Sequence, residues 1–138
     1  GHPPALDLHR ERALHDLLYE GARNDVVASA HDCSDGGLAI ALAEAAIGEG
    51  HGFAVTVGSD LPSHVELFSE SASRVVVSVA LEHEEQLREL GRAHGVPMAR
   101  LGETGGPRAV FAGLFEIDVA ELREAYDTAI PRLLGETG

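Results

Sequence analysis

The sequence predicts an α+β domain in which a layered, mixed β-sheet is covered by helices. Short apolar runs of strand length occur at residues 26–30, 53–57 and 75–80, and longer segments with helical spacing of apolar residues lie among them. Strands and helices that are mixed along the chain in this way are typical of layered α+β folds. At 138 residues the chain is long enough for one hydrophobic core, so we expect a single domain at 1–138.

The composition indicates a globular domain with an aliphatic core and an acidic surface. Apolar residues make up 44% of the chain, aromatic residues make up only 4%, and there is no tryptophan. Lys and Arg number 10 against 23 Asp and Glu, and the net charge of −13 disfavours contact with nucleic acids and anionic membranes. No apolar run approaches the roughly 18 residues of a membrane span, and no secretory pattern is visible. One cysteine cannot form an internal disulfide, so we expect a reducing, cytoplasmic location.

The first helix is predicted by a cap and an apolar stripe. Asp7 is expected to cap this helix, and Gly21 and residues 24–25 are expected to weaken and then end it. The apolar stripe consists of Leu14, Leu17, Leu18 and Ala22. The first strand should then occupy residues 26–30.

The remaining elements follow in chain order. They are a buried helix at 38–47, a strand at 53–57, a helical turn at 65–68, a strand at 75–80, a helix at 82–94, a strand at 96–101, a strand or hairpin arm at 109–115 and a last helix from 118. Residues 75–80 are apolar on both faces, which predicts a central strand. Residues 102–107 (GETGGP) predict a turn, and Pro131 is expected to kink the last helix.

The first candidate site is the turn HDCSDGG at residues 31–37, between a predicted strand and a buried helix. Paired glycines permit close approach to the backbone, and a helix N-terminus offers free N–H groups to an anion. The predicted phosphate- or nucleotide-facing residues are Asp32, Ser34, Asp35, Gly36 and Gly37. Asp32 and Asp35 are carboxylates three residues apart, a spacing that would also suit a Mg²⁺ ion held between the protein and a phosphate. The alternative is structural: Ser34 or Asp35 simply caps the helix, and Cys33 is a small apolar filler.

The second candidate is the polar cluster at residues 70–74, which directly precedes a buried strand. Such a cluster is costly unless it lines a cleft or pairs internally. The predicted cleft wall consists of Glu70, Ser71 and Arg74, with Arg74 able to hold a carboxylate or phosphate. The alternatives are a Glu70–Arg74 ion pair, or Arg74 bound to carbonyl groups at a helix end.

The residues alone do not predict a reaction. The eight histidines show no zinc-ligand spacing, and the chain has no nucleophile elbow, P-loop or dinucleotide fingerprint. No catalytic residue and no metal ligand is therefore predicted. The pattern supports a domain that is capable of binding an anion.

The two candidate stretches together resemble the formylglycinamidine ribonucleotide synthetase family. Residues 31–39 (HDCSDGGLA) resemble its HD-x-SDGGL-A motif, and residues 67–74 (LFSESASR) resemble its LF-x-ES-x-SR motif. The spacing of the two motifs fits, as does the ending at residues 122–131, so that the resemblance covers nearly the whole chain. Either motif alone would indicate only the wider superfamily of aminoimidazole ribonucleotide synthetase, selenophosphate synthetase, thiamine-phosphate kinase and the hydrogenase maturation protein.

The resemblance implies a part of a larger enzyme of purine biosynthesis. That enzyme converts formylglycinamide ribonucleotide to the amidine with ATP, Mg²⁺ and ammonia from glutamine. Its large subunit has two pseudo-symmetric halves, and this chain is similar to the C-terminal domain of the second half. The implied partners are the remaining domains of the large subunit, a glutaminase subunit and a small accessory subunit. Because the N-terminal ATP-binding domains are not in this chain, the isolated domain is expected to bind no cofactor alone and to be inactive.

One position departs from the motif of the family's first half, which reads Glu-Ser-Gln and contacts the substrate. Here the third residue is Ala72, which cannot supply the hydrogen bonds of an amide side chain. The resemblance therefore implies the half that holds a structural nucleotide, with a wall or support role for residues 70–74.

Three hypotheses follow for the chain: an enzyme fragment, a stand-alone nucleotide- or phosphate-binding module, or a purely structural module. A domain of a larger enzyme should also expose apolar surface that serves as an interface, so that self-association into a homo-oligomer is expected.

Overall fold

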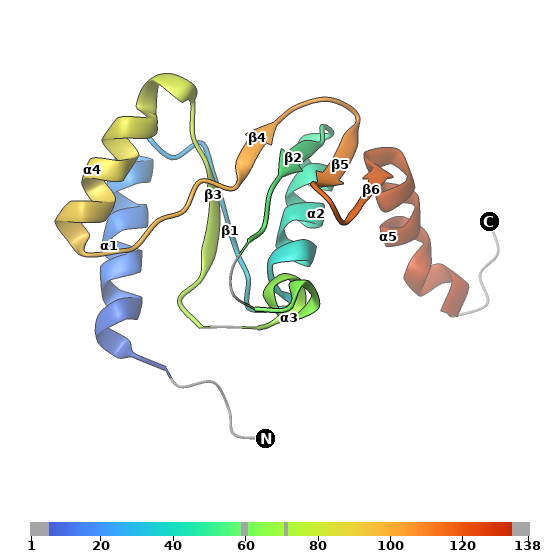
Figure 1. The fold of residues 1–138 in the computed structure, drawn as a ribbon, viewed down its shortest axis with the longest axis horizontal. Coiled ribbons are helices and arrows are strands. Elements are labelled where there is room, and N and C mark those ends of the chain that lie inside the picture. Colours follow the sequence, from blue (N-terminus) through green and yellow to red (C-terminus); the bar gives the residue numbers. More distant parts are fainter. Residues whose placement is uncertain (1–5, 59–60, 71, 134–138) are drawn as a thin grey trace. The chain divides into compact units, whose positions relative to one another are not determined.

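The computed structural model describes residues 6–58, 61–70 and 72–133 (Figure 1). The chain divides into two compact units: residues 1–42 with 61–100, and residues 43–60 with 101–138. Both units contain helices and strands, which confirms the predicted α+β class. None of the helices in the described ranges is long and apolar enough to cross a membrane.

The first unit contains a two-stranded antiparallel sheet and most of the helices. Its elements are α1 (Leu8–Arg23), β1 (Ser29–Asp32), the start of α2 (Gly37–Glu49), α3 (Ser63–Phe68), β3 (Val75–Ser78), the 3₁₀ turn η1 (Leu81–His83) and α4 (Glu84–His94). Helices α1 and α4 lie side by side (Figure 1). The core is built from Leu17, Val26 and Leu87, with half-buried aliphatic residues of both helices and of β3 around them.

Helix α1 begins and ends where the sequence predicts, with Asp7 before it and Asn24 after it. The Asp7 carboxylate accepts the backbone N–H groups of His9 and Arg10, and these bonds lower the pKa of Asp7. Gly21 does not end the helix, which runs on to Arg23. The apolar stripe was expected to include Ala22, but Ala22 is exposed and Gly21 is buried instead. Val27 packs closely on Gly21, where an added Cβ would lie 2.7 Å from Val27 Cγ2.

Strand β1 starts three residues later than predicted, at Ser29. Val26 and Val27 instead donate their N–H groups to the Gly21 carbonyl, which closes a turn after α1. Strand β3 pairs with β1 in a two-stranded sheet, and its residues are half-buried. The prediction of a central strand is therefore wrong, because apolar residues on both faces of β3 do not bring it a second strand partner among the described residues.

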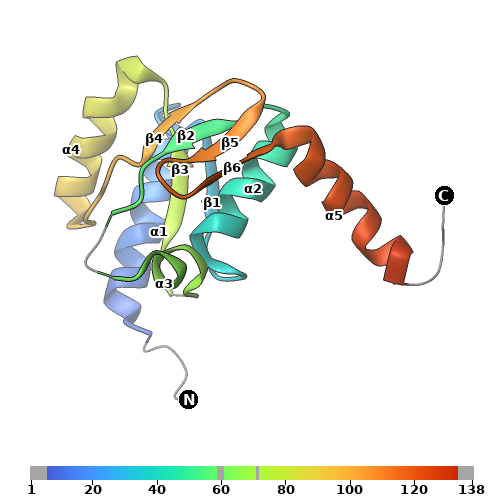
Figure 2. The same cartoon turned by 45° about the vertical axis from the view of Figure 1, so that its right-hand side comes forward.

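The second unit is built on a four-stranded mixed sheet. Its elements are the end of α2, β2 (Phe53–Val55), β4 (Gly102–Thr104), β5 (Arg108–Phe111), β6 (Phe115–Asp118) and α5 (Val119–Leu133). The strand order is β4-β2-β5-β6 (Figure 2), with β2 and β5 parallel and the other pairs antiparallel. The rings of Phe53 and Phe111 meet edge to face with centroids 5.2 Å apart.

The predictions for residues 96–107 are corrected in two places. The predicted strand at 96–101 is irregular, and the strand begins at Gly102, where a turn was expected. A Cβ at Gly102 would lie 1.9 Å from the Ala54 carbonyl oxygen, so this glycine serves close strand pairing. The turn follows β4 and contains Gly105 and Gly106, both with positive φ.

Candidate functional site

The paired glycines lie where the chain turns from β1 into α2. Gly36 and Gly37 have φ values of +75° and +77°, a left-handed conformation that favours glycine. A Cβ on Gly37 would lie 2.8 Å from the carbonyl oxygen of Leu67 and 2.8 Å from the carbonyl carbon of Phe68. Gly37 thus lets the end of α3 approach the start of α2, and the close approach that the sequence predicted for a ligand is made here by the protein backbone.

The N–H group of Gly36 donates to the Glu70 carboxylate, Oε1, at 3.1 Å. This bond joins the two predicted site motifs, which lie 34 residues apart. The N–H group directly before α2 therefore binds an oxyanion, as is expected at a helix N-terminus. Gly36 directly precedes α2, which begins at Gly37, so the N–H group in front of this helix is bonded to Glu70.

Asp32 and Ser34 bond to each other. The Ser34 hydroxyl donates to the Asp32 carboxylate, and this bond is the main cause of the lowered pKa of Asp32. Both residues and Asp35 are exposed. In the described ranges no three or more His, Cys, Asp or Glu side chains converge on one point.

Cys33 is fully buried and carries no exposed thiol. Burial raises the pKa of its thiol. Its N–H group donates to the Arg74 carbonyl at 3.0 Å, where the pairing of β1 and β3 begins. The residue is the small apolar filler that the sequence predicts.

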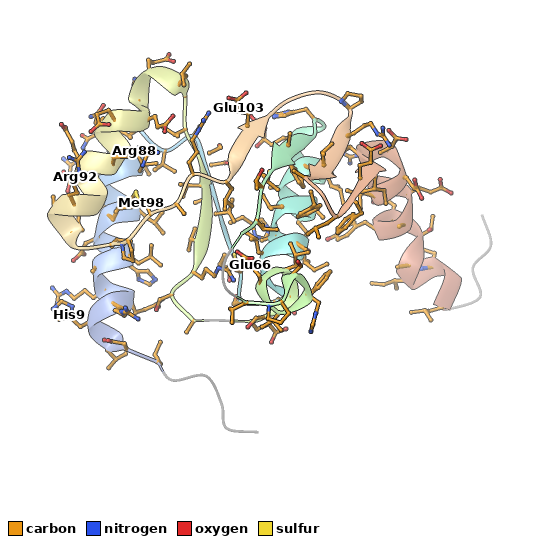
Figure 3. The ribbon with its side chains drawn as sticks, in the orientation of Figure 1. His9, Glu66, Arg88, Arg92, Met98 and Glu103 are labelled. Carbon is orange, nitrogen blue, oxygen red and sulfur yellow. The ribbon has the colours of Figure 1, made fainter. Side chains whose placement is uncertain are left out.

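The segment that contains Arg74 is held by α3 on one side and by α1 on the other. Nη1 of Arg74 lies 3.4 Å from the carbonyl oxygen of Glu66, a residue of α3 (Figure 3), which agrees with the helix-end alternative. Ser73 adopts φ +60° and donates its hydroxyl to the Glu11 carboxylate of α1. Ser71, the third residue of the predicted wall, lies outside the described residues.

A hollow of about 440 Å³ opens beside this segment, within the first unit. It brings together Asp32, Ser34 and Arg74 of the predicted site. Its other lining residues are Leu6, Glu11, Leu14, His15, Leu18, Ala30, His31, Ala72, Ser73 and Val75. Gly36, Gly37 and Glu70 are not among them, so the predicted residues form two separate groups: the clasp (Gly36, Gly37, Glu70) and the rim (Asp32, Ser34, Arg74).

Sequence reasoning missed the contribution of α1 to the rim. The Glu11 carboxylate accepts the Ser73 hydroxyl through Oε2, and His15 Nε2 lies 3.1 Å from Oε1. The only local signal was the four-residue spacing of Glu11 and His15, which places them on one helix face. That spacing is common on solvated helices and does not by itself indicate a contact with residue 73.

The fold and the turn place the chain in the class of α+β domains with a left-handed glycine turn before a buried helix. Comparison with known proteins identifies the family within this class. The family model described as "AIR synthase related protein, C-terminal domain" matches residues 2–113. The chain belongs to this family.

The similar curated proteins carry one name. The chain is 49% identical to phosphoribosylformylglycinamidine synthase subunit PurL of Thermobifida fusca over 138 residues, which are 98% of this chain and 18% of that protein. It is 50% identical to the subunit of the same name from a Nocardioides species, over 98% of this chain and 17% of that protein. The chain thus spans about a fifth of the length of the curated relatives it matches.

Solved structures show the same fold. Phosphoribosylformylglycinamidine synthase II from Thermotoga maritima superposes with a TM-score of 0.76 at 21% identity, over 87% of this chain and 22% of that chain. T. maritima PurL complexed with ATP gives a TM-score of 0.75 at 22% identity, over 86% of this chain and 22% of that chain. The described fold is therefore that of a domain of these larger proteins.

Proposed function

We propose that the chain is the C-terminal domain of the second half of a phosphoribosylformylglycinamidine synthase large subunit, folded as one domain over residues 1–138. The observation that carries this proposal is the identity of 49–50% to two such subunits over 98% of the chain. In the whole enzyme, formylglycinamide ribonucleotide, ATP and glutamine-derived ammonia would give the amidine in purine biosynthesis. ATP use is supported by the solved complexes of T. maritima PurL with ATP and ADP.

The domain's part in that enzyme is to present a phosphate-facing surface and to pack against neighbouring domains. The residues that would face a nucleotide phosphate are Asp32, Ser34, Asp35, Gly36 and Gly37. The hydrogen bond that the Gly36 N–H donates to a carboxylate supports this role. The wall role falls to Glu70, Ser71 and Arg74. Mg²⁺ and the reacting groups of ATP would be held by the other domains, so the isolated domain is inactive.

The partners would be the remaining domains of the large subunit, a glutaminase subunit and a small accessory subunit, in the cytoplasm. The structure of PurLQS from T. maritima, a multi-component assembly with the same fold in one chain, supports such partners. Exposed apolar side chains on α5, at Tyr126, Ile130 and Leu133, agree with a surface that packs against another part of the protein.

A domain exchange tests the proposal. We expect this chain, placed in the T. fusca subunit instead of the matching segment, to support amidine formation from ATP, ammonia and formylglycinamide ribonucleotide, and the chain alone to support none. The same hybrid with Gly37→Asp should lose activity, since the clasp cannot form. Gly113→Asp is the matched control, because Gly113 also has a positive φ (+75°) but open space around it. Turnover by the chain alone, or a folded but dead hybrid, would contradict the proposal.

A second candidate is a module that does not take part in the reaction. The clasp favours it, because Glu70 already occupies the Gly36 N–H and Gly37 is required for backbone packing. Such a module could bind a nucleotide or be purely structural, and calorimetry of the chain with ATP, ADP and the ribonucleotide distinguishes these two possibilities. Micromolar binding that Gly37→Asp abolishes supports a stand-alone nucleotide-binding module, and no measurable binding supports a structural one.

A further inference from the structure

Ser73 directly precedes Arg74, one of the three rim residues. Its φ of +60° is a left-handed conformation, which is unfavourable for a residue with a side chain. Such strain persists only where surrounding contacts impose it, and it is found frequently at functional sites. The contact that the structure gives for the Ser73 side chain is the bond to Glu11.

Glu11 is well placed to impose this conformation. It lies in the first turn of α1, a rigid 16-residue helix whose N-terminus is capped by Asp7. One carboxylate oxygen accepts the Ser73 hydroxyl, and the other lies 3.1 Å from His15 Nε2 one helical turn later. The carboxylate is thereby fixed at both oxygens, and only 31% of the Glu11 side chain is exposed.

The consequence of holding Ser73 falls on Arg74. The left-handed residue directly precedes Arg74 and β3, and the carbonyl of Arg74 accepts the Cys33 N–H at the first step of pairing with β1. Arg74 is half-buried and lines the hollow together with Asp32 and Ser34. The backbone conformation at residue 73 therefore sets the direction in which the chain enters Arg74, whose Nη1 lies 3.4 Å from the carbonyl oxygen of Glu66.

We propose that Glu11 is a positioning residue for the rim: it holds Ser73 in its left-handed conformation and so fixes the backbone of Arg74 where this residue lines the hollow together with Asp32 and Ser34. Glu11 lies outside both site motifs. The part of this inference that concerns ligand binding rests on the proposed phosphate-facing role. The part that concerns Arg74 does not.

Amide exchange in the 138-residue chain tests the positioning without a ligand. Glu11→Ala should accelerate exchange of the Cys33 amide, which donates to Arg74, by about tenfold, the loss expected for a hydrogen bond to a charged group. The Ala28 amide, which donates to Ser78 at the other end of the strand pair, should be unchanged. Glu11→Gln keeps an acceptor for Ser73 and should restore most of the protection. Asp16→Ala is the matched control, since Asp16 lies on the same helix and makes only an exposed ion pair with Arg12 at 3.8 Å.

A second variant separates positioning from general stability. Ser73→Gly removes both the strain and the hydroxyl, so that adding Glu11→Ala to Ser73→Gly should have no further effect on Cys33 exchange. Equal effects of Glu11→Ala with and without Ser73→Gly would overturn the proposal. So would equal acceleration at Cys33 and Ala28, because that result would indicate a purely structural role.

Titration with inorganic phosphate connects the positioning to function. If the wild-type chain binds phosphate, Glu11→Ala should weaken the binding several-fold, and Asp16→Ala should not. Unchanged phosphate affinity in a Glu11→Ala chain with accelerated Cys33 exchange would overturn the functional part of the proposal. If the wild-type chain alone binds no phosphate, the functional part of the proposal fails for the isolated domain, and the exchange data still decide whether Glu11 positions Arg74.

Discussion

The chain contains two glycine pairs, one in each unit, and they serve different purposes. Gly36–Gly37 and Gly105–Gly106 all have positive φ. An added Cβ at Gly105 or Gly106 meets nothing within 4 Å, whereas one at Gly37 meets the backbone of α3 at 2.8 Å. The second pair supplies a backbone conformation and two backbone hydrogen bonds with Gly52, without a close approach at either Cβ position. The first pair supplies the conformation and also the space in which two distant segments touch.

The largest difference between the pairs should appear at Gly37 and Gly106. Gly37→Ala should lower the free energy of unfolding by about 3 kcal/mol or more, because the backbone of α3 has to move as well as the turn. Gly106→Ala should cost only about 1 kcal/mol, the penalty of a left-handed residue in open space. Urea unfolding of both variants measures this, and equal losses would show that the contact with α3 does not matter.

Gly36 should behave as an intermediate case. Its added Cβ would lie 2.6 Å from Ile40 Cγ1, which belongs to a side chain that is 40% exposed and able to move. Gly36→Ala should therefore cost about 1–2 kcal/mol, mostly from the backbone conformation. Gly36→Ala combined with Ile40→Ala should cost no more than the sum of the backbone penalty and the Ile40 truncation. A cost for Gly36→Ala as large as that of Gly37→Ala would contradict this order.

The clasp adds a side-chain contact that the second pair lacks. Glu70→Ala should lower the unfolding free energy by about 1 kcal/mol, the usual effect of removing an acceptor at a helix start. Glu70→Gln should lose less, because its amide oxygen can still accept from Gly36. Glu89→Ala, an exposed acid on α4, serves as the control for charge. A Gly36 amide resonance that does not move in Glu70→Ala would contradict the bond.

The smallest effect concerns the carboxylate beside the first pair. The Ser34 hydroxyl lowers the pKa of Asp32 in the folded chain, so this bond stabilises the fold above the unfolded carboxyl's pKa of 3.8. The contribution is lost as the pH falls through the lower folded value. Ser34→Ala should raise the pKa of Asp32 toward 3.8, which a carboxyl NMR titration measures. An unchanged Asp32 titration in Ser34→Ala would show that the hydroxyl is not the cause.

Local patterns in the sequence were sufficient for the elements and for the turn. The Asp7 cap, the apolar positions Leu14 and Leu17, and the glycines at 36–37 were all readable, because each depends on neighbours a few residues away. The starts of β2 and β3 were predicted correctly, whereas those of β1 and β4 were not. Gly102 has the residue type of a turn, and only its approach to Ala54 places it in a strand.

The sequence by itself therefore determined the α+β class, the site of the left-handed turn and the two motifs that identify the family. The tertiary structure alone decided how those motifs are used. Gly36 meets Glu70 across 34 residues, and Ser73 meets Glu11 across 62. Such contacts depend on how helices and strands pack, and a short-range pattern of residue types contains no information about them.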